Sequence, residues 1–221
     1  MQKGGSAKTR TAREYFKITN VKSIGLTTPQ MRSIAKVIGK NHSMALELWA
    51  TGIHEARHIA SMIAEPEKVT KKMIESWLND FNSWDIVDGC CFTFFEKTPF
   101  AWELAHTWSS RKGEFQKRAG FTLMAGLAIH DKITSDKQFE KFFPDLLRES
   151  SDERNFVKKA INWAIRQIGK RNPKLCAKAI LLAEKIQRKG DPASRWIAAD
   201  ALRELRKYRR EGKIKNIGVK S

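Results

Sequence analysis

The chain has 221 residues, 41% of them hydrophobic and 10% aromatic, which is enough to bury a core in one large domain or two small ones. Its 42 Lys and Arg residues outnumber 24 Asp and Glu residues, giving a formal net charge of +18 at pH 7. This composition excludes a disordered chain. It favours a nucleic-acid partner over a membrane surface or plain solubilising charge.

Helical patterns begin near residue 27, after a basic N-terminal stretch without the apolar centre of a signal peptide. "TTPQMRSIAKVIG" predicts a helix with Thr28 as N-cap, Pro29 at its first position and Gly39 as its stop. "HEARHIASMIAE" predicts the next helix, and "TKKMIESWLNDF" predicts another that is capped by Thr70.

The remaining segments continue the helical pattern to about residue 207, and strand patterns are absent from the sequence. The predicted helices are "SWDIVDGCCFTFFEK", "TPFAWELAHTWSS", "EFQKRAGFTLMAGLAIHD", "DKQFEKFFPDLLRES", "DERNFVKKAINWAIRQIGK", "NPKLCAKAILLAEKIQ" and "DPASRWIAADALRELRKYRR". The fold class is therefore predicted as all-α. No apolar run reaches the roughly 18 residues of a membrane-spanning helix.

Weak internal repeats suggest antiparallel helix pairs of the HEAT or armadillo kind. Aligning "EARHIASMIA", "QKRAGFTLMA", "VKKAINWAIR" and "ASRWIAADAL" puts Arg57, Arg118, Lys159 and Arg195 in one position, and "DIVDGCCFTF" puts Asp88 there. We expect one solenoid domain over 21–208, with a short basic segment over 1–20 and a basic tail over 209–221.

"HEARH" matches the zinc-protease pattern H-E-x-x-H, in which two histidines one turn apart bind the metal. A zinc site also needs a third protein ligand, and no accompanying motif supplies one. Because the segment opens one repeat helix among five, we interpret His54, Glu55 and His58 as ordinary helix residues and expect no metal. Cys90, Cys91 and Cys176 fit neither a disulfide framework nor a metal pattern, which favours a reducing cytoplasm.

The aligned basic residues would follow a phosphate backbone, and Asp88 interrupts them with a carboxylate. Trp84 and Trp163 lie four residues from Asp88 and Lys159, so each shares a helix face with that position. An acid beside aromatic planes in a basic groove can stabilise a nucleobase or sugar that becomes cationic. The alternatives are that both tryptophans are core residues and that Asp88 forms a buried salt bridge with Arg118. Asp85 is interpreted as a structural residue of the first helical turn.

At these residues the sequence resembles the AlkD family of bacterial DNA alkylation repair proteins. The stretches that carry the resemblance are "IGLTTPQMRSIAKVIG", "SWDIVD", "FQKRAGF" and "NFVKKAINWAIRQIGKRNP". The resemblance implies a curved HEAT-like solenoid that holds duplex DNA and hydrolyses the N-glycosidic bond of purines alkylated at N3 or N7. It implies that Asp88 is the catalytic aspartate, that Trp84 and Trp163 contact the lesion sugar, and that Arg118 contacts the backbone.

We therefore expect a monomeric base-excision repair enzyme that acts on alkylated duplex DNA at the bacterial nucleoid. It would need no metal, small-molecule cofactor or membrane, because the alkylated base is already a cationic leaving group. Arg57, Lys159, Arg166 and Arg195 are expected to bind DNA beside Arg118. A noncatalytic HEAT-repeat protein that binds duplex or branched DNA is the alternative, and a protein-binding scaffold is a further one.

Overall fold

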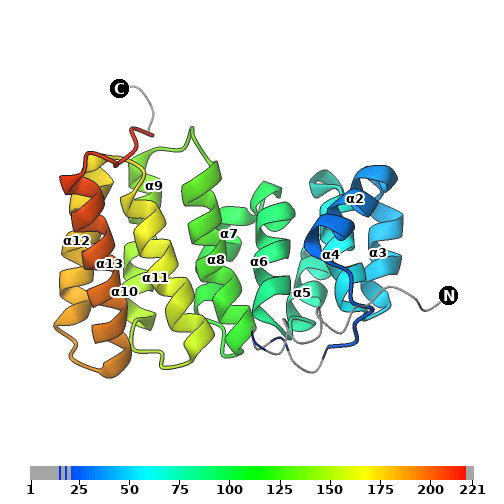
Figure 1. The fold of residues 1–221 in the computed structure, drawn as a ribbon, viewed down its shortest axis with the longest axis horizontal. Coiled ribbons are helices and arrows are strands. Elements are labelled where there is room, and N and C mark those ends of the chain that lie inside the picture. Colours follow the sequence, from blue (N-terminus) through cyan, green and yellow to red (C-terminus); the bar gives the residue numbers. More distant parts are fainter. Residues whose placement is uncertain (1–14, 16–17, 19–20, 218–221) are drawn as a thin grey trace. The chain divides into compact units, whose positions relative to one another are not determined.

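The computed structural model describes Tyr15, Ile18 and residues 21–217. Within these residues the secondary structure is helical, apart from an isolated bridge between Lys22 and Ile53 (Figure 1). The prediction of an all-α chain is confirmed. The basic segment predicted over 1–20 lies outside the described residues except for Tyr15 and Ile18.

The chain divides into two compact units, residues 1–101 and 102–221, and each is described by itself. The described helices of the first unit are α2 (Thr28–Ile38), α3 (His42–Ala50), α4 (His54–Ile63), η1 (Pro66–Lys68), α5 (Lys71–Asn79), α6 (Trp84–Thr93) and η2 (Phe95–Lys97). Those of the second are α7 (Ala101–Ser109), α8 (Glu114–His130), α9 (Asp136–Glu140), α10 (Phe143–Glu149), α11 (Asn155–Gly169), α12 (Pro173–Gln187) and α13 (Pro192–Arg210).

The helix ends follow their capping residues, with one correction at the start of α2. Thr27 rather than Thr28 is the N-cap, because the Gln30 side chain accepts hydrogen bonds from the backbone and hydroxyl of Thr27. Gly39 ends this helix at a φ of 72°, a conformation that favours glycine. Thr70 caps α5 as predicted, since its side chain accepts from the amide of Met73.

Two further differences from the predicted helices have local causes. The sequence interpretation missed α3, whose N-cap Asn41 accepts a hydrogen bond from the Met44 amide. "DKQFEKFFPDLLRES" forms α9 and α10 instead of one helix. Pro144 lies in the first turn of α10, where its missing N–H costs nothing, whereas it would break the interior of a continuous helix.

In the first unit, α4 packs against α2, α3 and α6. Trp49 and Trp77 stack with their ring centroids 3.9 Å apart, and Phe94 and Phe95 close the cluster around Trp77. These rings are buried, and burial of such large apolar surfaces is the main source of stability for short helices. The aromatic core therefore fixes the helices that support α4 and α6.

In the second unit, α11 packs against α8, α12 and α13. Figure 1 shows α8, α11 and α13 side by side, as the repeat alignment requires of these three helices. Gly120 lets α8 approach α7 closely, because a Cβ there would lie 2.4 Å from the backbone nitrogen of Ser109.

The beginning of the predicted basic tail is ordered against the second unit. α13 continues to Arg210, and beyond it the amides of Lys215 and Ile217 donate to the carbonyls of Lys170 and Arg171. Arg171 is itself buried, and its guanidinium donates to the carbonyls of Ala128 and Asp131. This arginine therefore serves the fold and contributes little to the basic surface.

Asp191, the N-cap of α13, should make the free energy of unfolding depend on pH. Burial by itself would raise the pKa of Asp191, but hydrogen bonds from Ser194 and Ser151 lower it to about 2. A depressed folded-state pKa stabilises the folded protein above the unfolded value of about 3.9, and this contribution is lost as pH falls from about 4 towards about 2. Asp191→Asn keeps a capping side chain that cannot titrate.

The free energy of unfolding, measured by urea titration from about pH 4.5 to about pH 2.5, is expected to fall less steeply in Asp191→Asn than in the parent. Parallel pH profiles for the two proteins would contradict this account of the cap.

Candidate functional site

α6 carries Trp84 at its first position and Asp88 one turn later. Residues four apart share a helix face. Both side chains are half-buried, whereas the core tryptophans of the chain, Trp49, Trp77 and Trp108, are only 3%, 2% and 0% exposed. Trp84 therefore keeps part of its surface available beside Asp88, as a residue that contacts a ligand must.

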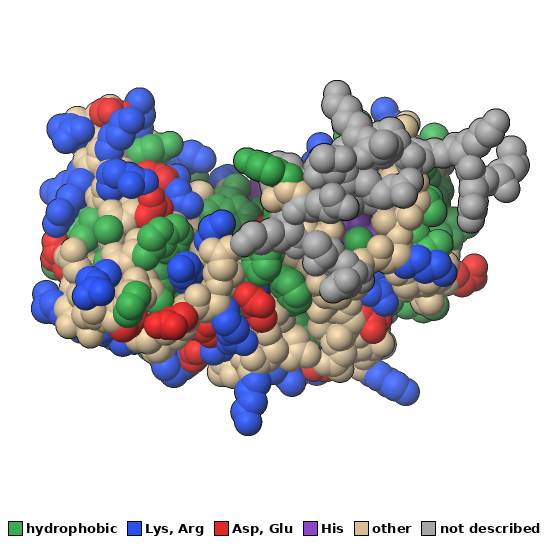
Figure 2. All heavy atoms as spheres, turned by 60° about the horizontal axis from the view of Figure 1, so that its bottom comes forward, with side chains coloured by type: hydrophobic (Ala, Val, Ile, Leu, Met, Phe, Trp, Pro, Cys, Tyr) green, Lys and Arg blue, Asp and Glu red, His purple; other side chains and the backbone are tan. Residues whose placement is uncertain are grey.

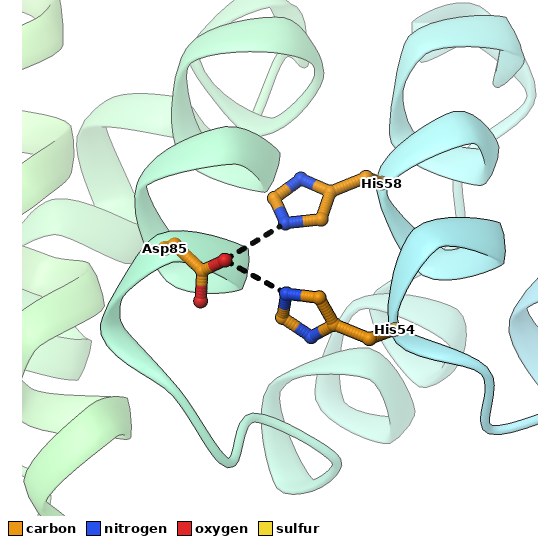
Figure 3. Close-up of side chains that lie close together, drawn as sticks. All are labelled: His54, His58 and Asp85. Carbon is orange, nitrogen blue, oxygen red and sulfur yellow. Dashed lines mark hydrogen bonds and ion pairs between the residues drawn. The ribbon is translucent and has the colours of Figure 1, made fainter. Parts of the chain in front are cut away.

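The first turn of α6 is tied to α4 by the carboxylate of Asp85. Its Oδ2 atom lies 2.7 Å from Nε2 of His54 and 3.3 Å from Nε2 of His58 (Figure 3). Burial by itself would raise the pKa of Asp85, but the hydrogen bonds and charge of the two histidines hold it well below its usual range. Asp85 therefore stays ionised at the junction of the two helices.

The sequence explains how this junction forms. His54 and His58 lie one turn apart in "HEARH" and point from the same face of α4 towards α6 (Figure 3). Gly89 makes room for the second ring, because a Cβ there would lie 2.8 Å from Nδ1 of His58. The sequence interpretation placed Asp85 in the first turn of the helix, which is where it lies, but missed its contact with the histidines, 27 and 31 residues away in the chain.

Glu55, the glutamate of the protease-like pattern, has a structural role. Its carboxylate accepts hydrogen bonds from the Ser23 hydroxyl and from the amides of Ile24 and Gly25. It thereby joins α4 to the segment before α2. A buried carboxylate used in this way is not placed as the general base that H-E-x-x-H proteases need.

Three of the predicted DNA-binding arginines make contacts within the protein. Arg57 donates to the carbonyl of Asp80, pairs with its carboxylate at 3.2 Å and lies over the ring of Trp49. Arg118 is only 6% exposed and donates to the carbonyl of Phe156 at 2.7 Å. Arg166 pairs with Glu204. These side chains stabilise the repeat helices, whatever else they contact.

The other predicted basic residues lie on the surface of the second unit. Lys159 on α11 and Arg195 on α13 are exposed, and Trp163, one turn after Lys159, is half-buried. Figure 2 shows Lys and Arg side chains scattered over this unit, with acidic side chains between them. Lys159 and Trp163 therefore share a partly accessible face of α11.

A protein-family comparison matches residues 2–205 to the family described as "DNA alkylation repair enzyme". The chain belongs to this family. A solved structure is similar over 98% of this chain and 94% of its own, with a TM-score of 0.76 and 21% sequence identity. It is described as representing "a new family of proteins related to the HEAT-like repeat DNA glycosylases with affinity for branched DNA structures". No curated protein matches the chain.

These comparisons confirm the HEAT-like fold predicted from the repeats, and they confirm the family predicted from the motifs. At 21% identity the structural similarity bears on the fold alone. Among the described residues, none of the helices has the length and apolar character needed to cross a membrane.

Because Arg118 is buried, we expect its substitution to lower the stability of the folded protein. Arg118→Ala removes the donor to the Phe156 carbonyl, and we expect a loss of about 1–3 kcal/mol in the free energy of unfolding. Arg195→Ala, an equal change at an exposed position, should stay within about 0.5 kcal/mol of the parent. Denaturant unfolding monitored by circular dichroism measures both. Equal stability of the two variants would mean that the guanidinium of Arg118 contributes little to the packing of α8 on α11.

Proposed function

We propose that the protein is a DNA glycosylase that removes purines alkylated at N3 or N7 from duplex DNA. The observation that carries the proposal is the pairing of half-buried Trp84 and Asp88 on one face of α6 in a member of the DNA alkylation repair enzyme family. Trp163 and the exposed basic residues of α11 and α13, in the second unit, are further residues that we propose contact the DNA.

The proposed reaction follows from the charge of the substrate. Alkylation makes the purine cationic, and when the N-glycosidic bond breaks its electron pair stays with the base, which leaves neutral. The deoxyribose then carries oxocarbenium character at C1′. The carboxylate of Asp88 stabilises this charge and orients a water molecule, whose oxygen bonds to C1′ and whose proton passes to the carboxylate or to solvent.

Aromatic side chains suit the same intermediate. The face of an indole ring carries negative potential, so Trp84 and Trp163 would each stabilise a cationic sugar packed against its own ring. Neither ring needs a proton to act in this way. The products are the free alkylated base and an abasic site, and the leaving group requires no general acid because it is already charged.

Substitution of Asp88 tests the catalytic proposal. Asp88→Asn keeps the size of the side chain and removes its charge, so release of N7-methylguanine from duplex DNA should fall at least tenfold, which corresponds to about 1.4 kcal/mol or more of transition-state stabilisation. Affinity for the duplex should be retained or rise, because a negative charge near phosphate is lost. Single-turnover release of the free base, quantified by chromatography, gives the rate.

Asp191→Asn is the matched control, since it makes the same chemical change at a helix cap remote in sequence and should release base at the parent rate. A parent protein that is folded and binds DNA, yet releases no more base than a protein-free sample, would contradict the proposal for this lesion.

A second candidate function is noncatalytic binding of branched DNA, which the description of the similar solved structure favours. The net charge of +18 suits either function, because phosphate contacts dominate the affinity of both. The two functions differ in whether base is released and in whether a four-way junction is bound more tightly than a duplex of equal length.

The exposed basic residues predict how the protein holds DNA in either case. Lys159→Ala and Arg195→Ala should each weaken duplex binding and reduce the slope of log affinity against log salt by about 1. Lys137→Ala, an exposed lysine on α9 outside the aligned position, is the control and should leave the slope unchanged. Fluorescence anisotropy at several salt concentrations measures the slopes. Equal slopes for all four proteins would remove α11 and α13 from the interface.

A further inference from the structure

The junction between α4 and α6 gathers two imidazole nitrogens and a carboxylate oxygen in a small, largely buried space. The ligand-type atoms of His54, His58 and Asp85 all lie within 4.8 Å of one another (Figure 3). Both histidine side chains are buried, and that of Asp85 is 21% exposed. We propose that these three residues bind a divalent transition-metal ion, with zinc as the best match to two nitrogens and one oxygen.

The distances suit this ion. Zinc binds imidazole nitrogen and carboxylate oxygen at about 2.0–2.2 Å, so the ligand atoms of a tetrahedral site lie about 3.3 Å apart. Oδ2 of Asp85 already lies 2.7 Å and 3.3 Å from the two Nε2 atoms. The longer distance already matches the spacing of zinc ligands, and the shorter one is about 0.6 Å below it.

The second carboxylate oxygen supports the same conclusion. Oδ1 of Asp85 is buried and has no hydrogen-bond partner among the described residues. A buried acceptor without a partner is costly, and a cation would compensate for it. Zinc binding would displace any proton that an Nε2 atom carries, because imidazole binds the ion in its neutral form.

Gly89 on α6 leaves room for the ring of His58 at the proposed site. Its missing side chain allows the ring of His58 to lie against the helix backbone with Nε2 directed at Asp85. Three protein ligands leave a fourth position for water, and the partly exposed Asp85 provides a path to solvent.

Because Glu55 is bound to the segment before α2, the site lacks the general base of an H-E-x-x-H protease. The ion would instead cross-link α4 to the first turn of α6. Asp85 is the residue after Trp84 and lies three before Asp88. Metal binding would therefore stabilise the start of α6, where Trp84 and Asp88 lie. This inference does not depend on glycosylase activity.

The second unit provides a matched control. Nδ1 of His106 lies 2.6 Å from Oδ2 of Asp145, and no second histidine joins this pair among the described residues. A single histidine–carboxylate pair is a common structural contact with too few ligands for a zinc site. Loss of His106 should therefore leave metal binding unchanged.

The experiment uses the full chain, stripped of metal with a chelator and dialysed, without DNA. Titration with zinc should show one ion bound per chain and a rise in Tm. Titration with cobalt(II) should give the visible bands of a tetrahedral nitrogen and oxygen site. His58→Gln and Asp85→Asn should each weaken zinc binding at least tenfold, and His106→Gln should bind like the parent.

The result for the parent decides the question even if a variant folds poorly. The proposal is overturned if the parent binds no zinc at about 100 μM, a concentration at which even a weak site, with a Kd of about 100 μM, would be half occupied. It is also overturned if cobalt shows a thiolate charge-transfer band, which would place the ion on cysteine, or if His106→Gln loses as much affinity as His58→Gln. Failure of base release with zinc binding intact would refute the glycosylase and leave the metal site standing.

Discussion

The carboxylate of Asp85 accepts from two histidines on α4, and the arrangement of the candidate site in the first unit depends on this contact. It fixes the first turn of α6, where Trp84 begins the helix and Asp88 follows one turn later. The aromatic stack of Trp49 and Trp77 supports the same helices from the core. Precise placement of a catalytic carboxylate requires such support, since its effect on a developing charge depends on short, fixed distances.

The basic residues of the chain divide into two groups with different consequences. One group contacts carbonyls, carboxylates and aromatic rings inside the units, and it includes Arg57, Arg118 and Arg171. Lys159 and Arg195 are exposed on the surface of the second unit. The net charge therefore includes cations that already make contacts within the units. Phosphate contacts supply affinity in this scheme, and the acid and tryptophans supply the chemistry.

The fold was largely predictable because helical periodicity and capping residues are local signals. Thr70 and Gly39 mark helix ends by their own chemistry, and the repeat alignment identified α8, α11 and α13 as equivalent helices that pack in succession. α3 was missed, although Asn41 is a good capping residue. The contact between Asp85 and the two histidines could not be predicted, because it joins residues about 30 positions apart and depends on how α4 packs on α6. Likewise, sequence alone does not distinguish an arginine that donates to a buried carbonyl, as Arg118 does, from one that faces solvent.

The central proposal is that Asp88, with Trp84 on the same face of α6, acts on the lesion sugar. The most direct measurement is a crystal structure of the Asp88→Asn variant with a duplex that carries one N7-methylguanine. The account predicts that C1′ of the lesion lies against the indole ring of Trp84, with the residue 88 side chain within about 4 Å of it or one water away. A duplex bound with its lesion remote from these two residues would contradict the account and make structure-specific DNA binding the better explanation of the fold.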